Sequence, residues 1–396
     1  MIQRSALLKK NLNACLKRKS LFFFGPRQTG KSTFLKATYP NALYIDLLKN
    51  KTYNEYLREP QLLEVDIQSY KKKTAGHLII IDEIQKLPNL LDEVHSLIES
   101  DKSLRFILTG SSARKLKRLG SNLLGGRAAW FSFYPLTFIE LQHNIKFEKD
   151  LERRLNHGGL PTCYSQTEAF EELKDYVGLY LKTEIQDEGL VRNIENFGRF
   201  LEASALTNAK QLNYTEIGSD AQVPPRTVQN YFQILEDTLV GFLLPAFTKT
   251  KTRKAISTAK FYLFDTGVTN SLLHRKWTES GTIEFGELFE QFIINEILAY
   301  KSYAREDWGL SYWRSTSQFE VDLILDNHQK HIAIEIKGKN KVTKKDCSGL
   351  LAFEDDIQLY RKIIIYTGDR VRKLENGIEL LPYKEFFKQL WHQKLF

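Results

Sequence analysis

The feature that most constrains the fold of this chain is a loop bounded by glycines near its N-terminus. Residues 21–32 read LFFFGPRQTGKS, an apolar run followed by the loop, and residues 32–40 continue with helical spacing. This is the pattern G-x-x-x-x-G-K-[ST] in the strand, loop and helix context that it requires. Gly25 and Gly30 allow the loop to close so that backbone N–H groups and the dipole of the following helix surround phosphate groups. The pattern predicts an α/β domain with a phosphate-binding loop.

Two side chains at the end of the loop are suited to phosphate chemistry. We expect Lys31 to reach the β- and γ-phosphates of a nucleotide, and Ser32 to place its hydroxyl on Mg²⁺. The nucleotide-binding residues expected along the loop are Gly25, Pro26, Arg27, Gln28, Thr29, Gly30, Lys31, Ser32 and Thr33. The cofactors that the loop predicts are therefore ATP and Mg²⁺.

A second apolar run, HLIIIDE at residues 77–83, ends in two adjacent carboxylates. Such a run is typical of a parallel strand that is buried on both faces. We expect Asp82 to hold Mg²⁺ through water, and Glu83 to orient and deprotonate the attacking water. Two solvated acids after a core strand are the alternative, which the upstream loop disfavours. Loop and strand together predict hydrolysis of a nucleoside triphosphate.

Further polar residues lie beside the next two predicted strands. Ser111 comes after the predicted strand at 105–109, where a hydroxyl would lie near the γ-phosphate at the carboxyl edge of the sheet. A turn or helix-capping serine explains it equally well. Arg127, after a glycine pair, is a candidate to act on the transferring phosphoryl group in its own subunit or in a neighbour, and a structural ion pair is the alternative. Whether Arg114 or Arg127 reaches across a subunit interface stays open.

Several motifs together resemble those of a large family of bacterial and archaeal AAA-type ATPases. They are GPRQTGKST, LIIIDEIQKLP, ILTGSSARKL, LLGGRAAWFSFYPLTFIEL and HGGLP. The resemblance covers essentially the whole chain and is most specific in the ATPase motifs. It implies an AAA-type parallel sheet over residues 1–145, a helical and winged-helix region over 146–275, and a nuclease-like domain over 276–396. Arg27 and Gln28 match the family's Pro-Arg-Gln loop, and Arg127 matches its Gly-Arg position.

The middle of the chain predicts helices without catalytic residues over 168–208 and then a winged helix-turn-helix. The latter consists of a helix at 214–218, a turn with two prolines, a helix at 226–239 and a strand at 241–244. If this segment reads DNA, the contacts come from the second helix, at Arg226, Thr227, Gln229 and Asn230, and the basic residues 249–254 form the wing. Glu236 and Asp237 are unfavourable near phosphate, so subunit packing is the alternative.

Two strands are predicted in the last third, FEVDLIL at 319–325 and HIAIEIK at 331–337, with a hairpin turn between them. Period-two alternation places Glu320 and Asp322 on one face, and Glu335 and Lys337 on one face. If the strands pair, these groups converge. Asp322 and Glu335 would then hold Mg²⁺, and Lys337 would stabilise charge or orient water during phosphodiester cleavage.

The order of these residues resembles the PD-(D/E)XK restriction-endonuclease fold. A helix over 285–301 supplies the upstream acid, and the GxxxE pattern of the ATPase family falls on Gly286 and Glu290. Val321 stands where the motif has proline. Two interpretations stay open: a metal-dependent nuclease, and a domain that has lost metal affinity and persists as a platform for nucleic acid or a partner.

Composition limits the partners and the compartment. The chain of 396 residues has 57 Lys and Arg against 48 Asp and Glu, and this excess permits an anionic partner such as DNA without requiring one. Cys15, Cys163 and Cys347 form neither a disulfide framework nor a zinc cluster, which predicts a reducing cytoplasm. The apolar runs are far shorter than the roughly 18–20 residues of a membrane span.

The sequence thus predicts a cytoplasmic, Mg²⁺-dependent ATPase that engages DNA or a protein partner and could form a homo-oligomer. One alternative is a nucleotide-dependent binding switch whose C-terminal domain cuts nothing. Another is an assembly factor that uses ATP to oligomerise.

Overall fold

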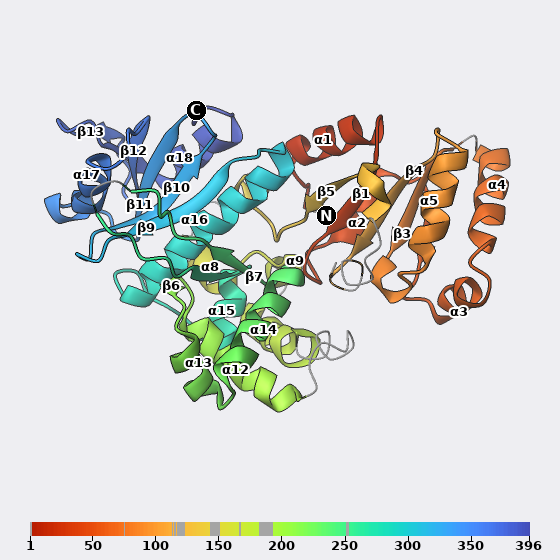
Figure 1. The fold of residues 1–396 in the computed structure, drawn as a ribbon, viewed down its shortest axis with the longest axis horizontal. Coiled ribbons are helices and arrows are strands. Elements are labelled where there is room, and N and C mark those ends of the chain that lie inside the picture. The colour runs from red at the N-terminus through yellow and green to blue at the C-terminus, as the bar shows by residue number, and fades with distance from the viewer. Residues whose placement is uncertain are drawn as a thin grey trace. The chain divides into compact units, whose positions relative to one another are not determined.

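The computed structural model describes residues 2–74, 76–112, 114, 116, 123–142, 151–165, 168–181, 193–250 and 253–396 (Figure 1). They form two compact units. The first comprises Met1–Tyr134, Asp237–Val240 and Ser302–Ala304, and the second comprises Pro135–Glu236, Gly241–Lys301 and Arg305–Phe396. Within these described ranges, no helix is both long and apolar enough to span a membrane.

The first unit is built on a parallel sheet. Its strands are β1 (Ser20–Phe24), β2 (Leu43–Asp46), β3 (Leu78–Asp82), β4 (Arg105–Gly110) and β5 (Ala128–Ser132). They lie in the order β2-β3-β4-β1-β5, and every pairing is parallel. Asp46 pairs with Asp82, and Phe24 pairs with Gly110, so the carboxyl ends of these strands meet at one edge. The predicted α/β fold with a parallel P-loop sheet is confirmed.

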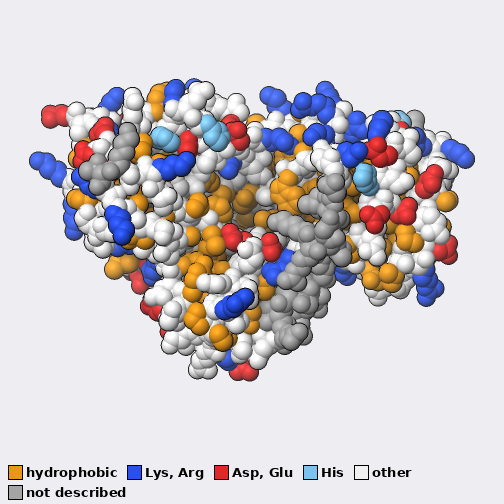
Figure 2. Space-filling model, viewed as in Figure 1, with side chains coloured by type: hydrophobic (Ala, Val, Ile, Leu, Met, Phe, Trp, Pro, Cys, Tyr) orange, Lys and Arg blue, Asp and Glu red, His pale blue; other side chains and the backbone are white. Residues whose placement is uncertain are grey.

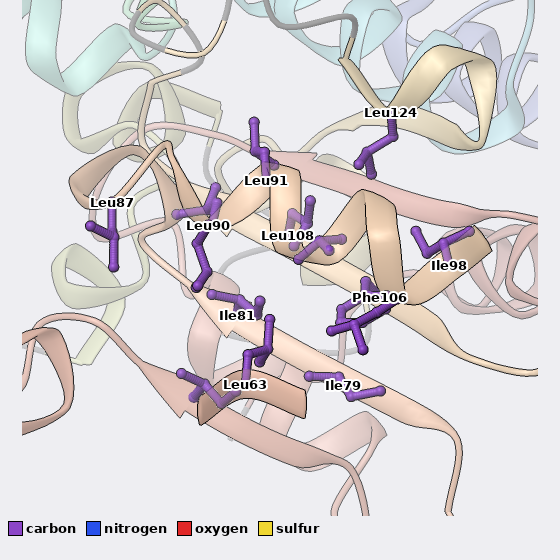
Figure 3. Close-up of a cluster of buried hydrophobic side chains, with 14 of the residues drawn as sticks. Leu63, Ile79, Ile81, Leu87, Leu90, Leu91, Ile98, Phe106, Leu108 and Leu124 are labelled. Carbon is purple, nitrogen blue, oxygen red and sulfur yellow. The ribbon is translucent and has the colours of Figure 1, made fainter. Parts of the chain in front are cut away.

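Helices cover this sheet because their apolar residues recur at helical spacing. They are α1 (Ala6–Leu16), α2 (Lys31–Thr38), α3 (Asn50–Arg58), α4 (Leu62–Thr74), η1 (Ile84–Lys86), α5 (Leu90–Ser100) and η2 (Leu123–Gly126). In α5 the buried residues are Leu90, Leu91, Val94, Leu97 and Ile98, one stripe of the helix. Figure 3 shows this stripe over side chains of β3 and β4. The continuous apolar run in β3 is explained by burial on both faces.

The second unit begins with short helices, α7 (Phe138–Leu141), α8 (Leu151–His157), α9 (Pro161–Ser165), α10 (Ala169–Asp175) and η3 (Tyr176–Leu181). The chain continues through α12 (Ile194–Leu206), β6 (Lys210–Gln211), α13 (Tyr214–Ala221), α14 (Pro225–Asp237), β7 (Gly241–Leu244), β8 (Lys260–Leu263) and α15 (Thr266–Leu272). The three strands form an antiparallel sheet with β8 in the middle. The predicted helix over 168–208 is thus α10, η3 and α12, and residues 182–192 lie outside the described part.

The C-terminal part of this unit is a mixed sheet flanked by helices. Its elements are α16 (Ile283–Ala304), β9 (Gly309–Arg314), β10 (Glu320–Asp326), β11 (His331–Lys337), η4 (Lys344–Cys347), α17 (Ser348–Glu354), β12 (Arg361–Tyr366), β13 (Arg372–Lys373), β14 (Glu379–Pro382) and α18 (Tyr383–Trp391). The strand order is β13-β14-β12-β11-β10-β9. Strands β10 and β11 pair antiparallel, as the hairpin pattern predicts.

Candidate nucleotide site and carboxylate cluster

The loop between β1 and α2 is held against the neighbouring strands by close backbone contacts. The N–H of Gly25 donates to the carbonyl of Gly110 at 3.2 Å. A Cβ atom at Gly25 would lie 2.2 Å from the carbonyl oxygen of Phe133, so only glycine fits there. Gly30, just before α2, has φ of 90°, in the left-handed region that favours glycine. Both glycines of the sequence motif are therefore required by the geometry of the loop.

Lys31 places its ammonium group inside the loop. Its Nζ donates to the carbonyls of Gly25 at 2.6 Å and Pro26 at 2.8 Å, and the residue is buried. Thr29 donates from its buried hydroxyl to the same Pro26 carbonyl at 2.8 Å. Thr33 is exposed, one residue beyond Ser32 on α2. The loop is thus closed around the lysine head group.

Ser32 and Asp82 are brought together from the loop and the end of β3. The Ser32 hydroxyl donates to Oδ2 of Asp82 at 2.7 Å. The Tyr44 hydroxyl donates to the same oxygen, and burial together with the charge of Asp82 raises the pKa of Tyr44. The other oxygen of Asp82, Oδ1, is buried without a hydrogen-bond partner among the described residues. A hydroxyl and a carboxylate with one unused oxygen fit the oxygen ligands that Mg²⁺ prefers.

Glu83 is held by a hydrogen-bonded glutamine that sequence reasoning missed. Nε2 of Gln85 donates to Oε2 of Glu83 at 2.5 Å and to the Ser111 hydroxyl at 3.1 Å. Burial raises the pKa of Glu83, while the positive charges of Lys31 and Arg27 oppose this. A Cβ at Gly110 would lie 2.0 Å from Oε1 of Gln85. In the sequence, only Gly110 indicates this contact, because a glycine at the end of a strand leaves room for another side chain.

Arg127 lies away from this site. Its carbonyl accepts from the N–H of Ser20, the first residue of β1, which places Arg127 at the edge of the sheet opposite the loop. Its guanidinium forms an ion pair with Glu99 of α5, which is the structural alternative considered for this arginine. The structure does not bring Arg127 to the loop of its own chain. Arg114 forms an ion pair with Asp237 at 3.4 Å.

Three of the four residues expected to contact DNA lie on one stripe of α14. Arg226, Gln229 and Asn230 are exposed, Thr227 is half-buried, and Val228 packs into the core. The helix begins at Pro225 and ends at Asp237, two residues earlier than predicted. The three exposed side chains at positions i, i+3 and i+4 share one face of the helix.

The basic segment expected to form a wing, at 249–254, is flanked on both sides by residues that pair with the mixed sheet. Phe247 and Ile256 donate backbone hydrogen bonds to carbonyls of β9. Arg253 forms ion pairs with Asp355 at 2.9 Å and Asp356 at 3.6 Å. Lys249 and Lys254 are exposed, and residues 251–252 lie outside the described part. The charge of Arg253 is therefore already matched by carboxylates.

Basic side chains gather elsewhere too, on and just after α1. Lys9, Lys10, Lys17, Arg18 and Lys19 are exposed, and Figure 2 shows Lys and Arg side chains in this part of the first unit. The sequence motifs did not point to this cluster, because its residues belong to no recognised pattern.

In the second unit, the strand pairing brings together the predicted residues of the nuclease-like motif. Nζ of Lys337 lies 2.6 Å from Oε1 of Glu335 and 3.6 Å from Oδ2 of Asp322. The Ile336 N–H donates to Oδ2 of Asp322 at 2.8 Å. Burial and then the charge of Asp322 raise the pKa of Glu335 well above its usual range. We call Glu290, Glu320, Asp322 and Glu335 the carboxylate cluster.

A second lysine, which sequence reasoning missed, lies in the carboxylate cluster. Nζ of Lys260, from β8, lies 3.0 Å from Oε1 of Glu290 and 2.5 Å from Oε1 of Glu320. The Tyr262 hydroxyl also donates to Glu290 at 2.5 Å. Burial raises the pKa of Glu290 to about 7, although the positive charge of Lys260 opposes the shift.

These residues do not fit a divalent metal ion as they are arranged. The ammonium group of Lys260 faces the oxygens of Glu290, Glu320 and Asp322. In the part of the chain that the structure describes, no group of three or more His, Cys, Asp or Glu side chains has a geometry that could hold a metal. The carboxylates expected to hold a nuclease metal ion thus pair with lysine ammonium groups instead.

Comparison with protein families matches three successive parts of the chain. Residues 17–142 match the family described as AAA domain. Residues 148–279 and 285–386 match two families described as Domain of unknown function, DUF8612 and DUF4143. The sheet, the loop and the first match together make residues 17–142 an AAA-type P-loop domain. No curated protein sequence matches the chain.

Several solved structures show distant similarity. A Signal Transduction ATPase with Numerous Domains (STAND) protein with a tetratricopeptide repeat sensor from Pyrococcus horikoshii is 15% identical with a TM-score of 0.27, over 77% of this chain and 48% of that one. The ORC1 protein of Aeropyrum pernix in complex with DNA is 13% identical with a TM-score of 0.27, over 70% and 94%. The ADP form of ORC2 from Aeropyrum pernix is 14% identical with a TM-score of 0.31, over 68% and 92%.

The chain spans about half the length of the STAND protein. Identity and TM-score are too low in all three structures for a ligand or partner to be carried over to this chain.

Proposed function

We propose that the protein binds ATP and hydrolyses it, with Mg²⁺, at the loop between β1 and α2. The observation that carries this proposal is the contact between Ser32 and Asp82, which joins the loop to the end of β3 and leaves a buried carboxylate oxygen unused. Ser32 and Asp82 would hold Mg²⁺, which supplies positive charge opposite the phosphates. The AAA domain match over residues 17–142 supports the same proposal.

The protein's own groups have distinct roles in this proposal. Lys31 exchanges the carbonyls of Gly25 and Pro26 for phosphate oxygens. Glu83 orients the attacking water and accepts its proton, and its raised pKa improves it as a base. Gln85 and Ser111 hold Glu83 in place before the substrate arrives.

The test is steady-state ATP turnover combined with nucleotide binding. Lys31→Ala should lose nucleotide binding or turnover, because the phosphates lose their ammonium partner. Glu83→Gln should retain ATP binding and lose hydrolysis, because the amide cannot accept the proton. Lys51→Ala, which removes a lysine that is 89% exposed on α3, is the matched control and should behave as wild type. Normal turnover in both site variants would refute the proposal.

We further propose that the nucleotide controls engagement of DNA through the segment from α12 to β8. The order helix, strand, helix, helix, strand, strand in this segment is typical of a winged helix, and the exposed stripe of α14 is the position of a recognition helix. The exposed residues Arg226, Gln229 and Asn230 have side chains that can contact phosphates and base edges.

For the C-terminal part we propose a platform for nucleic acid or a partner protein rather than a nuclease. This choice between the two interpretations of the sequence rests on Lys260, whose ammonium lies among the carboxylates that a nuclease would use for metal. Incubation with plasmid and single-stranded DNA plus Mg²⁺ or Mn²⁺ tests it, and cleavage would contradict it.

A further inference from the structure

Lys260 enters the carboxylate cluster from a rigid position. It lies on β8, the middle strand of the three-stranded sheet, where it pairs with Gln211 of β6 and Leu244 of β7. The residue is only 3% exposed. Because both edges of its strand are paired, the backbone at Lys260 is fixed by the sheet. The side chain is thus built into the cluster and does not reach it from a loop.

The ammonium of Lys260 is matched to three carboxylates. Its Nζ lies 2.5 Å from Glu320, 3.0 Å from Glu290 and 3.7 Å from Asp322. The contact with Glu290 is a hydrogen bond, and the contacts with Glu320 and Asp322 are ion pairs. The ring of Tyr312, whose centroid is 5.3 Å away, lines another side of the head group. These contacts stabilise the Lys260 ammonium group inside the carboxylate cluster.

Three basic side chains face the four carboxyl groups of the carboxylate cluster. Lys260, Lys337 and Arg314 each lie within ion-pair distance of at least one of these groups. A divalent ion would have to replace the Lys260 ammonium or be repelled by it, since like charges at such distances in a buried site interact strongly. Mg²⁺ also requires oxygens at about 2.1 Å in octahedral geometry, which the ammonium prevents.

We propose that Lys260 is a built-in cation that takes the place of a divalent metal ion in the carboxylate cluster, so that the native protein binds no Mg²⁺ or Mn²⁺ there. The ammonium links β8 to α16 and β10 as a bound metal would. It thereby joins the DUF8612 segment, residues 148–279, to the DUF4143 segment, residues 285–386, without any cofactor. This inference concerns the cluster alone and does not depend on ATP hydrolysis.

The test measures Mn²⁺ binding by equilibrium dialysis of the full chain. All proteins carry Asp82→Asn, so that metal at the P-loop does not contribute. Lys260→Met keeps a side chain of similar length and removes the charge, and it should bind one additional Mn²⁺ about tenfold or more tightly than the parent protein, a change of about 1.4 kcal/mol or more. Lys210→Met is the matched control, because Lys210 lies on the adjacent strand β6, is 51% exposed and pairs with Glu287. It should bind no additional Mn²⁺.

A second comparison decides the proposal even if Lys260→Met does not fold. The parent protein, with Lys260 intact, is compared with a variant that also carries Asp322→Asn. Equal Mn²⁺ binding by the two supports the built-in cation. Mn²⁺ bound by the parent and lost with Asp322→Asn would overturn it, as would a folded Lys260→Met protein, checked by circular dichroism, that binds no more Mn²⁺ than the control.

Discussion

At the scale of single residues, Gln85 shows how one side chain can connect two functional groups. It donates to both Glu83 and Ser111, and its carboxamide packs against Gly110. In the proposed mechanism it positions Glu83, since it has no group that could itself accept a proton from water. Without it, Glu83 would keep its place in the sequence and lose its fixed orientation.

We therefore predict that Gln85→Ala lowers kcat for ATP by about tenfold or more, because a general base must lie within hydrogen-bond reach of its proton. KM and nucleotide affinity should change little, since Lys31 and Ser32 remain. Steady-state kinetics and a nucleotide-binding titration separate the two quantities. Gln68→Ala, on the exposed face of α4, serves as control. A rise in KM with unchanged kcat would show that Gln85 acts in binding instead.

Another buried acid, Glu296 on α16, is held by hydrogen bonds from two other elements of the second unit. It accepts hydrogen bonds from the Phe138 N–H at 2.9 Å and from Nε1 of Trp391 at 2.8 Å, and burial raises its pKa to about 7. In the unfolded chain the pKa returns to its ordinary 4.5. Between these values the folded state holds a proton that the unfolded state has lost. The free energy of unfolding should therefore fall as pH rises from about 4.5 to about 7.

Glu296→Gln cannot titrate, so we predict a flatter stability profile over this pH range. The wild type should lose up to about 3 kcal/mol more than the variant between the two ends of the range. Urea unfolding at several pH values measures this difference. Glu195→Gln, at a side chain that is 84% exposed, should retain the wild-type slope. An identical slope in Glu296→Gln would show that Glu296 keeps its ordinary pKa in the folded state.

At the scale of elements, α14 separates a buried face from an exposed one. Val228, Tyr231, Phe232, Ile234 and Leu235 are buried. Arg226, Gln229, Asn230 and Gln233 are exposed on the opposite face. The buried residues fix the rotation of the helix, so the exposed stripe is presented in one orientation.

If α14 contacts the DNA backbone, Arg226→Ala should weaken duplex binding at all sequences and reduce the slope of log K against log salt by about 1. Fluorescence anisotropy with labelled duplexes at several salt concentrations measures both quantities. Lys388→Ala on α18, 67% exposed, is the control and should leave both unchanged. Equal effects of the two substitutions would argue against α14 as the contact surface.

The strands and the loop of the nucleotide site could be predicted from the sequence because their signals are local. Glycine spacing located the loop, and the apolar run located β3 with Asp82 and Glu83 at its end. Tyr44 and Lys260 could not be predicted in the same way. Tyr44 meets Asp82 because β2 lies beside β3 in one sheet, whereas Lys260 on β8 meets Asp322 on β10, a strand of a different sheet. No local pattern encodes either approach. For Arg127 the motif matches the ATPase family, but the residue pairs with Glu99 of α5 and does not lie at the phosphate-binding loop of its own chain.

At the scale of the whole molecule, the chain combines an AAA-type domain with a second unit in which lysine ammonium groups pair with the carboxylate cluster. We predict that the protein does not cleave plasmid or single-stranded DNA in Mg²⁺ or Mn²⁺, with or without ATP, because the Lys260 ammonium lies among the carboxylates that would hold the metal ion. Agarose gels of the digests check this. Cleavage that disappears with Asp322→Ala and Lys337→Ala would show that the C-terminal part is a nuclease.

The close approach of Gly25 to Phe133 has a consequence for the energetics of nucleotide binding. Because the start of the loop is already confined between β4 and β5, the conformational entropy of ordering it is lost when the protein folds, and nucleotide binding need not supply that ordering. Affinity for nucleotide is then linked to the integrity of strand pairing. Temperature or denaturant that loosens β5 from β1 should release nucleotide before the unit as a whole unfolds.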